Sequence, residues 1–225
     1  EFDKLFMALN DQKIEPTTEL PPEFISLCNT HLPRSSQRPL QYLHERGLKQ
    51  KDIVKWKIGY CPEGEYGGRI IIPSFNNNGD INYYIARSYV GHKWKYKNPP
   101  ASKNVIFNEL SIDWDESVVL VEGVFDAIVA GTNAIPILGS TLRDNTKLFQ
   151  AIVLNDSPVY LALDSDADKK LSYIVKNLLK YDIEAYKIDT SGIEDVGSIT
   201  KAQYSVLQQK AEPISFDDFF SLNYL

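Results

Sequence analysis

The stretches Val118-Val119-Leu120-Val121-Glu122-Gly123 and Val159-Tyr160-Leu161-Ala162-Leu163-Asp164-Ser165-Asp166 each join an apolar run to acidic residues. Short apolar runs rich in branched residues are typical of strands in a parallel sheet, which is buried on both faces. The carboxyl ends of such strands meet at one edge of the sheet, where ligands bind. We therefore expect Glu122, Asp164 and Asp166 to lie together and to offer the oxygen ligands that Mg²⁺ prefers.

Strand-like and helical patterns alternate around these two runs. Alternation of side chains along a strand would place Asp164 and Asp166 on the same side, and Gly123 is expected to permit a sharp turn from strand to helix. The pattern predicts an α/β domain with a mostly parallel sheet flanked by helices. Its expected strands are residues 118–121, 134–137, 159–163 and 184–188, and its expected helices are near residues 124–131, 144–151, 168–180 and 200–210.

The chain before residue 116 follows a different pattern. Leu40 and Leu43 repeat at helical spacing before Gly47, and residues 49–57 indicate a second short helix. Extended segments are expected at residues 69–73, 81–88 and 93–97, with a hairpin loop at residues 76–80. The predicted organisation is an N-terminal arm (1–37), a small mixed helical and antiparallel subdomain (38–115), a metal-binding domain (116–192) and a C-terminal helical part (193–225).

Charge divides the chain unevenly. Residues 31–107 contain 13 Lys and Arg against 5 Asp and Glu, whereas residues 108–225 contain 9 against 19. This asymmetry indicates a polyanion partner for the basic part and cations for the acidic part, with an ordinary solvated surface as the alternative. Aromatic residues interleave with the basic ones, where they either stack on bases or pack in the core of a small sheet: Tyr83, Tyr84, Tyr89, Trp94 and Tyr96.

Several classes of protein are disfavoured by composition. A chain of 225 residues with 43% hydrophobic residues can form a substantial core. It contains no apolar run of about 20 residues and no signal-peptide pattern, so we expect a cytosolic protein without a membrane partner. No zinc site is expected, because no zinc-ligand spacing connects Cys28, Cys61, His31, His44 and His92. Since the chain begins with Glu1 rather than Met, we expect an excised or processed chain.

The order of the acidic motifs resembles the Toprim domain, which DnaG-type primases share with topoisomerases and some nucleases. That order is strand-Glu-Gly, a helix, Leu138-Gly139-Ser140 after a second strand, and then strand-Asp-x-Asp and a helix. Residues 121–127 are most similar to the primase version. The resemblance implies that Glu122, Asp164 and Asp166 bind Mg²⁺ or Mn²⁺ and carry the catalysis.

Three further acidic residues remain candidates around this motif. Asp168 begins the helix after the Asp-x-Asp pair, where it is either a metal ligand or a helix cap. Asp126 lies one helical turn beyond Glu122, as a helix-surface carboxylate or one behind the metal ligands. Asp195 belongs to a segment that resembles the late acidic motif of the family and is a candidate third metal ligand, although Gly197 stands where the family usually has a second aspartate.

The resemblance to primases extends over residues 38–220. The segments Tyr42-Leu43-x-x-Arg46-Gly47-Leu48 and Ile58-Gly59-Tyr60-Cys61-Pro62 are similar to the N-terminal subdomain of the primase core. Residues 68–73, 86–88 and 95–100 resemble its basic segments, which in the family face the template and the incoming nucleotide. The matching candidates for binding DNA or nucleotide are Arg69, Arg87, Lys95, Lys97, Asn98 and Lys103.

The resemblance implies the catalytic core of a DNA primase, which makes short RNA primers on single-stranded DNA by metal-dependent nucleotidyl transfer from ribonucleoside triphosphates. A replicative helicase is a further candidate partner, and the compact motifs suit a phage-encoded primase as well as a bacterial one. The alternatives are a Toprim-type nuclease and a non-catalytic nucleic-acid-binding replication module. A topoisomerase would need a catalytic tyrosine in a separate domain, which this length hardly accommodates.

Overall fold

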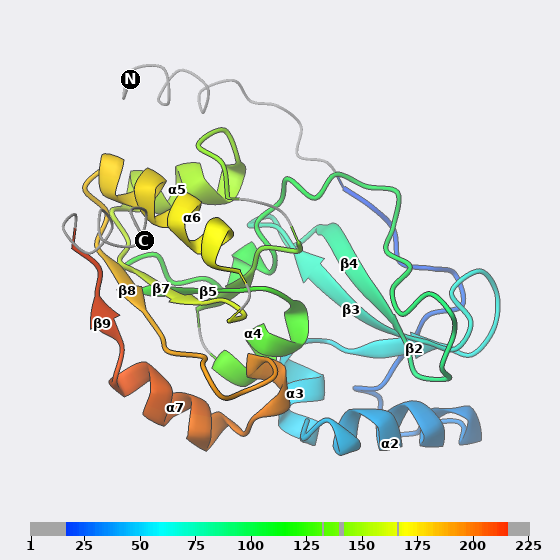
Figure 1. Ribbon diagram of the computed structural model, residues 1–225. Coiled ribbons are helices and arrows are strands. Elements are labelled where there is room, and N and C mark those ends of the chain that lie inside the picture. The colour runs from blue at the N-terminus through cyan, green and yellow to red at the C-terminus, as the bar shows by residue number, and fades with distance from the viewer. Residues whose placement is uncertain (1–16, 132, 140–141, 166, 216–225) are drawn as a thin grey trace.

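The protein folds into two sheets that are packed side by side and covered by helices (Figure 1). The computed structural model describes residues 17–131, 133–139, 142–165 and 167–215. The first sheet has four antiparallel strands in the order β1-β2-β3-β4. The second has the order β6-β5-β7-β8-β9, and only the β8–β9 pair is antiparallel. This architecture confirms the expected α/β class, with a mostly parallel sheet preceded by a small antiparallel subdomain.

The first sheet and its helices come from the basic part of the chain. The helices begin and end close to the predicted positions, and the arm contains a short strand, β1, that pattern alone did not indicate and that pairs with β2. Leu27, just beyond that strand, is completely buried. The elements are β1 (Ile25–Ser26), η1 (Arg34–Ser36), α2 (Gln37–Glu45), α3 (Gln50–Lys55), β2 (Gly59–Cys61), β3 (Arg69–Phe75) and β4 (Ile81–Ser88).

The expected strand at residues 93–97 was wrong. This segment makes only an isolated bridge between Arg87 and Tyr96, and its residues are exposed. Its lysines alternate with aromatic residues, which resembles a half-buried strand in sequence. In the structure its side chains are exposed, and within the described residues the pairing stops at one bridge.

The second sheet follows the predicted alternation of strands and helices. Its elements are η2 (Glu109–Ser111), β5 (Val118–Val121), α4 (Val124–Ala130), β6 (Ala134–Pro136), α5 (Lys147–Asn155), β7 (Val159–Ala162), α6 (Asp168–Lys180), β8 (Ala185–Lys187), η3 (Val196–Ser198), α7 (Lys201–Gln209) and β9 (Glu212–Pro213). Within these described residues, no helix is both long and apolar enough to cross a membrane.

The strand order reverses at β5, which pairs with β6 on one side and with β7 on the other. The chain therefore leaves the end of β5 towards one half of the sheet and later returns to the other half. Such a switch point opens a crevice at the carboxyl ends of the two strands. Glu122 follows β5 and Asp164 follows β7, so both acidic motifs border this crevice.

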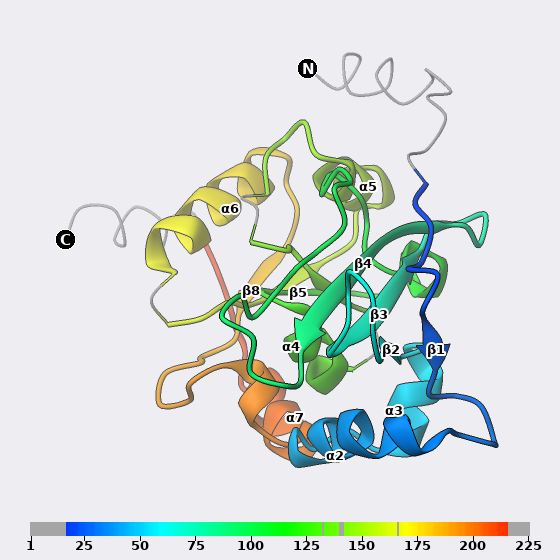
Figure 2. The ribbon, with the colours of Figure 1, turned by 90° about the vertical axis from the view of Figure 1, so that its right-hand side faces the viewer.

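Both faces of β5 are buried, as its unbroken apolar run predicted. Val118 and Leu120 pack into a cluster with α5 and α6, whereas Val119 and Val121 face the cluster that includes α4. Figures 1 and 2 show the same division, with α5 and α6 on one side of the sheet and α4 on the other.

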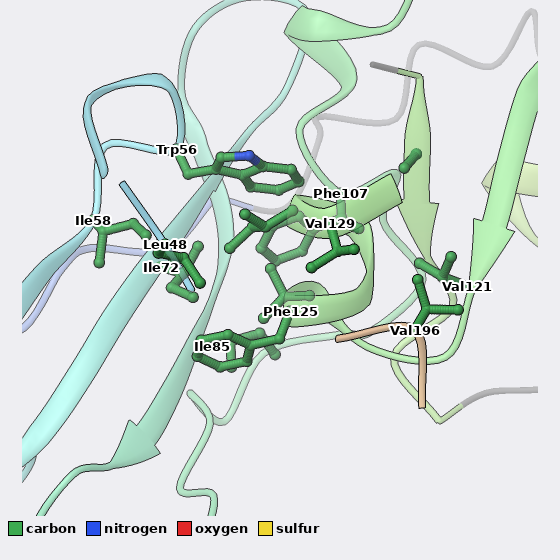
Figure 3. Close-up of a cluster of buried hydrophobic side chains, with 14 of the residues drawn as sticks. Leu48, Trp56, Ile58, Ile72, Ile85, Phe107, Val121, Phe125, Val129 and Val196 are labelled. Carbon is green, nitrogen blue, oxygen red and sulfur yellow. The ribbon is translucent and has the colours of Figure 1, made fainter. Parts of the chain in front are cut away.

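The core on the α4 side continues into the antiparallel sheet. Figure 3 shows Phe125 of α4 next to Ile85 of β4, in one cluster with Ile72 of β3. Trp56 and Phe107 extend the cluster, with ring centroids 6.4 Å apart. Because one continuous core contacts both sheets, it fixes α4 relative to the basic residues of β4.

Candidate active site

Glu122 lies at the end of β5 with one of its two oxygens without a partner. Its Oε2 accepts a hydrogen bond from Lys170 Nζ of α6 at 2.5 Å, and the side chains of both residues are 21% exposed. Its Oε1 is buried and has no hydrogen-bond partner among the described residues. A buried carboxylate oxygen without a donor is costly, so this atom is suited to a cation ligand.

Asp126 connects the turn after β5 to the late acidic segment. Its Oδ2 accepts from the Gly123 N–H at 2.8 Å, and its Oδ1 accepts from the Gly197 N–H at 2.7 Å. Burial raises the pKa of the Asp126 carboxyl to about 6, against the lowering by these two N–H groups, and the charges of Asp195 and Asp164 raise it further. Asp195 and Asp164 therefore both lie within electrostatic reach of Asp126.

The close approach of the Asp126 carboxylate explains why glycine stands at positions 123 and 197. Gly123 has φ −134° and ψ 171°, which any residue adopts, so the expectation that it permits a sharp turn was wrong. A Cβ at Gly123 would lie 3.2 Å from Asp126 Oδ2, and a Cβ at Gly197 would lie 2.8 Å from Asp126 Oδ1. Gly197, where the family usually has an aspartate, therefore gives the Asp126 carboxylate the room to reach both N–H groups.

The remaining acidic candidates lie around the same edge of the sheet. Asp164 and Asp168 line a small pocket beyond β7, and Asp168 is an exposed first residue of α6. Asp195 is half-buried and lines a larger pocket beside Asp126. Asp166 lies outside the described residues. Within the described part of the chain, no three Asp, Glu, His or Cys side chains are grouped to hold a metal ion, so the triad stays a prediction.

A pair of arginines faces Asp126 from the antiparallel subdomain. Arg87 of β4 donates to the hydroxyls of Tyr42 and Tyr96, both at 2.5 Å. Arg46, just after α2, donates to the same Tyr42 hydroxyl at 3.0 Å. Both guanidinium groups lie over the Phe125 ring, at 4.6 Å from its centroid for Arg46 and 5.3 Å for Arg87. Neither forms an ion pair with a described carboxylate.

A pocket of about 730 Å³ is lined by residues of both charges. Arg46 and Arg87 line this pocket together with Asp126 and Asp195. We call the arginines with Tyr42, Tyr96 and Phe125 the basic wall, and Glu122, Asp126, Asp164 and Asp195 the acidic wall. Of the acidic wall, Asp126 and Asp195 line the pocket, whereas Glu122 precedes the pocket residue Gly123 and Asp164 lines the smaller pocket beyond β7. Lys201 of α7 forms an ion pair with Asp52 of α3 at 2.5 Å, which joins the subdomains below α4 (Figure 1).

The other predicted basic residues have different surroundings. Arg69 is 5% exposed and donates to the carbonyls of Trp94 and Lys95, so its donors hold the loop after β4. Asn98 accepts from the Ala86 N–H of β4, which also fixes that loop. Burial and these contacts account for both side chains, and we do not propose them as phosphate contacts.

The predicted lysines are more accessible. Lys95 is exposed and lines the large pocket next to Arg87. Lys97 forms an ion pair with Glu65 at 3.1 Å and covers the ring of Tyr66. Lys103 lies at another edge, with its Nζ 3.5 Å from the Leu138 carbonyl. Of the predicted basic residues, the structure therefore brings Arg87 and Lys95 to the pocket.

Sequence reasoning did not select Arg46 or Lys170. Arg46 was part of a recognised motif, and its spacing of four residues from Tyr42 on a helix was a usable signal, because such residues face one another. Lys170 gave no such signal, because its contact with Glu122 spans 48 residues and depends on how α6 packs.

The comparisons with known proteins agree with this fold. No family model matches the chain. A curated DNA primase of Thermotoga maritima is 26% identical over a 153-residue alignment, and the match covers 48% of this chain and 27% of that protein. The chain therefore spans about a quarter of the length of this relative.

Solved structures match a larger part of the chain. The catalytic domain of DnaG primase bound to single-stranded DNA has a TM-score of 0.70 at 17% identity, covering 84% of this chain and 76% of that one. The E. coli primase catalytic core has a TM-score of 0.69 at 17% identity, covering 84% and 78%. The zinc-binding and RNA polymerase domains of Aquifex aeolicus primase give 0.66 at 20% identity, covering 79% and 57%. The chain therefore has the fold of the DnaG-type primase catalytic core, with its Toprim domain.

Proposed function

We propose that this chain is the catalytic core of a DnaG-type primase, which synthesises RNA primers on a single-stranded DNA template. The observation that carries the proposal is the pocket that Arg46 and Arg87 line together with Asp126 and Asp195. Two arginines held by neutral groups line the same pocket as two carboxylates that lie near the switch point of a parallel sheet. A triphosphate with its bound cation complements both walls, because the arginines bind phosphate oxygens and the carboxylates bind the cation.

The residues of the basic wall would bind and orient phosphate groups. The planar guanidinium groups of Arg46 and Arg87 present parallel donors, which suit phosphate oxygens better than a lysine does. The hydroxyl of Tyr42 fixes both groups at once, so little conformational freedom is lost when a ligand binds. Lys95, at the rim of the pocket, would add a contact that tolerates different sequences.

The residues of the acidic wall fit a divalent cation. The Oε1 of Glu122, which has no hydrogen-bond partner among the described residues, is a ready ligand, and Asp164 together with Asp166 would supply further oxygens. Mg²⁺ or Mn²⁺, when bound, would stabilise the charge that develops on the attacking and leaving oxygens. Asp126 would act behind the ligands by holding the turn after Glu122 against Gly197.

The similar solved structures support the proposed partner, since one of them contains single-stranded DNA. In this scheme residues 38–115 contact template and nucleotide and residues 116–192 hold the cation. The C-terminal helical part, residues 193–225, contributes described residues such as Asp195 and Lys201 to the pocket lining. Residues 1–37 precede this core, and residues 25–26 within them pair with β2. A replicative helicase stays a prediction of the family resemblance.

Incorporation of labelled ribonucleotides tests the proposal. The template is a single-stranded DNA, used alone and with an annealed RNA primer so that initiation and extension are separated. We expect incorporation that needs template and Mg²⁺ or Mn²⁺. Glu122→Gln should reduce it more than about a hundredfold, because it weakens cation binding at the reacting phosphate. Glu116→Gln, at an exposed residue before β5, is the matched control.

Two results would contradict the proposal. Metal-dependent cleavage of DNA without synthesis would identify a Toprim-type nuclease. Binding of single-stranded DNA without any metal-dependent reaction, with or without the annealed primer, would identify a non-catalytic binding module.

A further inference from the structure

Trp94 is an exposed aromatic side chain on a well-anchored loop. It is 72% exposed, whereas Trp56 is 5% exposed and Trp114 is partly buried. The other tyrosines that the sequence grouped with it differ sharply, since Tyr83 and Tyr84 are buried in the sheet at 1% and 3% exposure. Tyr96 is 43% exposed, but Arg87 lies over its ring at 5.1 Å and donates to its hydroxyl. Trp94 is therefore the most exposed of these rings for which a role within the protein is not already evident.

The backbone around Trp94 is fixed by buried donors. The guanidinium of Arg69 donates to the Trp94 carbonyl at 2.9 Å and to the Lys95 carbonyl at 3.3 Å. The Ser88 N–H also donates to the Lys95 carbonyl, and the Lys97 N–H donates to the Ala86 carbonyl. The ring is thus presented by an ordered backbone, which lowers the entropy cost of binding.

The charges around Trp94 select the kind of ligand. Residues 91–98 contain Lys93, Lys95 and Lys97 and no acidic residue. Lys93 Nζ lies 5.8 Å from the centroid of the Trp94 ring. Lys95 and Tyr96, the next two residues, line the large pocket of the basic wall. An aromatic face between cations, at the rim of an anion-binding pocket, complements a single strand whose bases are unpaired and whose phosphates are close.

We propose that Trp94 is a stacking platform for an unpaired template base that is about to enter the pocket. Lys93 and Lys95 contact the phosphates on either side of that base. The inference rests on the proposed function, since it assumes that the polyanion is single-stranded DNA. It adds a residue that binds the base itself, independently of sequence, because every base has a face that can stack.

An oligonucleotide with abasic sites tests this assignment, because it keeps the phosphates and lacks the bases. Binding of poly(dT) and of its abasic counterpart is measured by fluorescence anisotropy for the wild type and for Trp94→Ala and Trp94→Phe. We expect Trp94→Ala to weaken poly(dT) binding by roughly 5- to 150-fold and abasic binding hardly at all. Trp94→Phe, which keeps an aromatic ring, should retain most of the wild-type affinity for poly(dT).

Intrinsic fluorescence gives a second readout. Poly(dT) should quench the emission of the wild type, and the quenching should disappear in Trp94→Phe, where Trp56 and Trp114 remain. Tyr173→Ala, which removes another exposed aromatic residue on α6, is the matched control. Thermal unfolding should be unchanged in all variants, because neither side chain is part of the core.

The outcomes separate the inference from the proposed function. If Trp94→Ala binds poly(dT) as tightly as the wild type, or loses poly(dT) and abasic binding equally, the stacking platform is refuted while priming is untouched. If the wild type binds neither oligonucleotide and incorporates no ribonucleotide, the proposed function itself fails and the inference fails with it.

Discussion

The basic wall and the acidic wall hold their charges in different ways. Arg46 and Arg87 are fixed by tyrosine hydroxyls and an aromatic face, so their positive charge is not neutralised by a described carboxylate. In the acidic wall, Glu122 has a lysine counterion and Asp126 has two backbone N–H donors. The arginines of the basic wall can therefore bind an anion. In the acidic wall, the carboxylates of Glu122 and Asp126 are already stabilised by other groups of the protein.

This difference follows from the cost of burying charge. A guanidinium spreads its charge over a plane and is only weakly hydrated, so neutral oxygens and a ring can hold it. Carboxylates gathered at one strand edge repel one another and must be compensated by a cation or protonated. We therefore expect substitutions in the basic wall to act on ligand binding, and substitutions in the acidic wall to act on stability when no cation is added.

The largest effect is expected for Arg87→Leu. It removes a donor that faces the pocket, and loss of such an electrostatic contact reduces turnover by roughly 100- to 1,000-fold, or about 3–4 kcal/mol. Arg87→Lys keeps the charge but cannot reach Tyr42 and Tyr96 together, so an intermediate loss is expected. The measurement is kcat/KM for ribonucleotide incorporation.

Arg34→Leu removes a positive charge from an exposed position and is the control for net charge. Wild-type kcat/KM in Arg87→Leu would show that the basic wall does not contact the substrate. Thermal unfolding of each variant separates loss of binding from loss of fold.

Protonation of Asp126 in the acidic wall should make the stability of the protein depend on pH. Because burial raises the pKa of Asp126 to about 6 from 3.8, the folded protein holds this proton more tightly than the unfolded chain. The resulting stabilisation is complete below about pH 4 and is lost as the pH rises through about 6. It amounts to at most about 3 kcal/mol.

Urea unfolding of the wild type and of Asp126→Asn, in EDTA at several pH values, isolates this contribution. The difference in unfolding free energy between the two should shift in favour of the wild type as the pH falls from 7 to 4. Asp156→Asn is an exposed control, and its left-handed backbone with φ 51° also suits asparagine. A difference that is independent of pH would refute the raised pKa.

The strands could be predicted from sequence better than the side-chain contacts. The apolar run of β5 is buried on both faces and therefore signals its own position, and α6 spans the predicted residues 168–180. Residues 93–97 alternate like a strand, but whether a strand forms depends on a covering layer that the local pattern does not encode. Arg69 illustrates the same limit, since its type indicates a phosphate contact and only the fold shows its buried carbonyl partners.

The part of the site that could be predicted is the part that depends on strand order, because strand order brings the carboxyl ends of β5 and β7 together. Glu122 and Asp164 lie at strand ends as that rule predicts, and Arg87, named by the family resemblance, lines the pocket, while their roles stay predictions. Lys170 and Gly197 could not be predicted in this way, because each acts through one contact between segments far apart in sequence. Such pairings depend on rotamers and helix packing rather than on periodicity.

A smaller effect is expected for Lys170→Met, which keeps the length of the side chain and removes its charge. Glu122 would then be left without its counterion in a mostly buried position, which costs about 2–3 kcal/mol after allowing for partial exposure. Added Mn²⁺ should stabilise this variant more than the wild type, because the cation no longer competes with the ammonium group. Thermal unfolding with and without Mn²⁺ measures both effects.

The neighbouring exposed residue provides the control for Lys170. Lys169→Met changes the net charge equally and should leave stability and the response to Mn²⁺ unchanged. If Lys170→Met were as stable as the wild type in EDTA, the ion pair would not be what compensates Glu122.

The smallest effect is expected for Gly197→Ala, at about 1–2 kcal/mol. The added Cβ would lie 2.8 Å from Asp126 Oδ1, so either the carboxylate or the η3 backbone must move. A double-mutant cycle with Asp126→Ala identifies the cause by urea unfolding, since removing the carboxylate should abolish most of the cost of Gly197→Ala. Gly197→Asp, which restores the aspartate usual in the family, should cost more, because it adds a like charge beside Asp126 as well as bulk. If Gly197→Asp were instead as stable as the wild type in EDTA, crowding around Asp126 would not explain why this chain has glycine at that position.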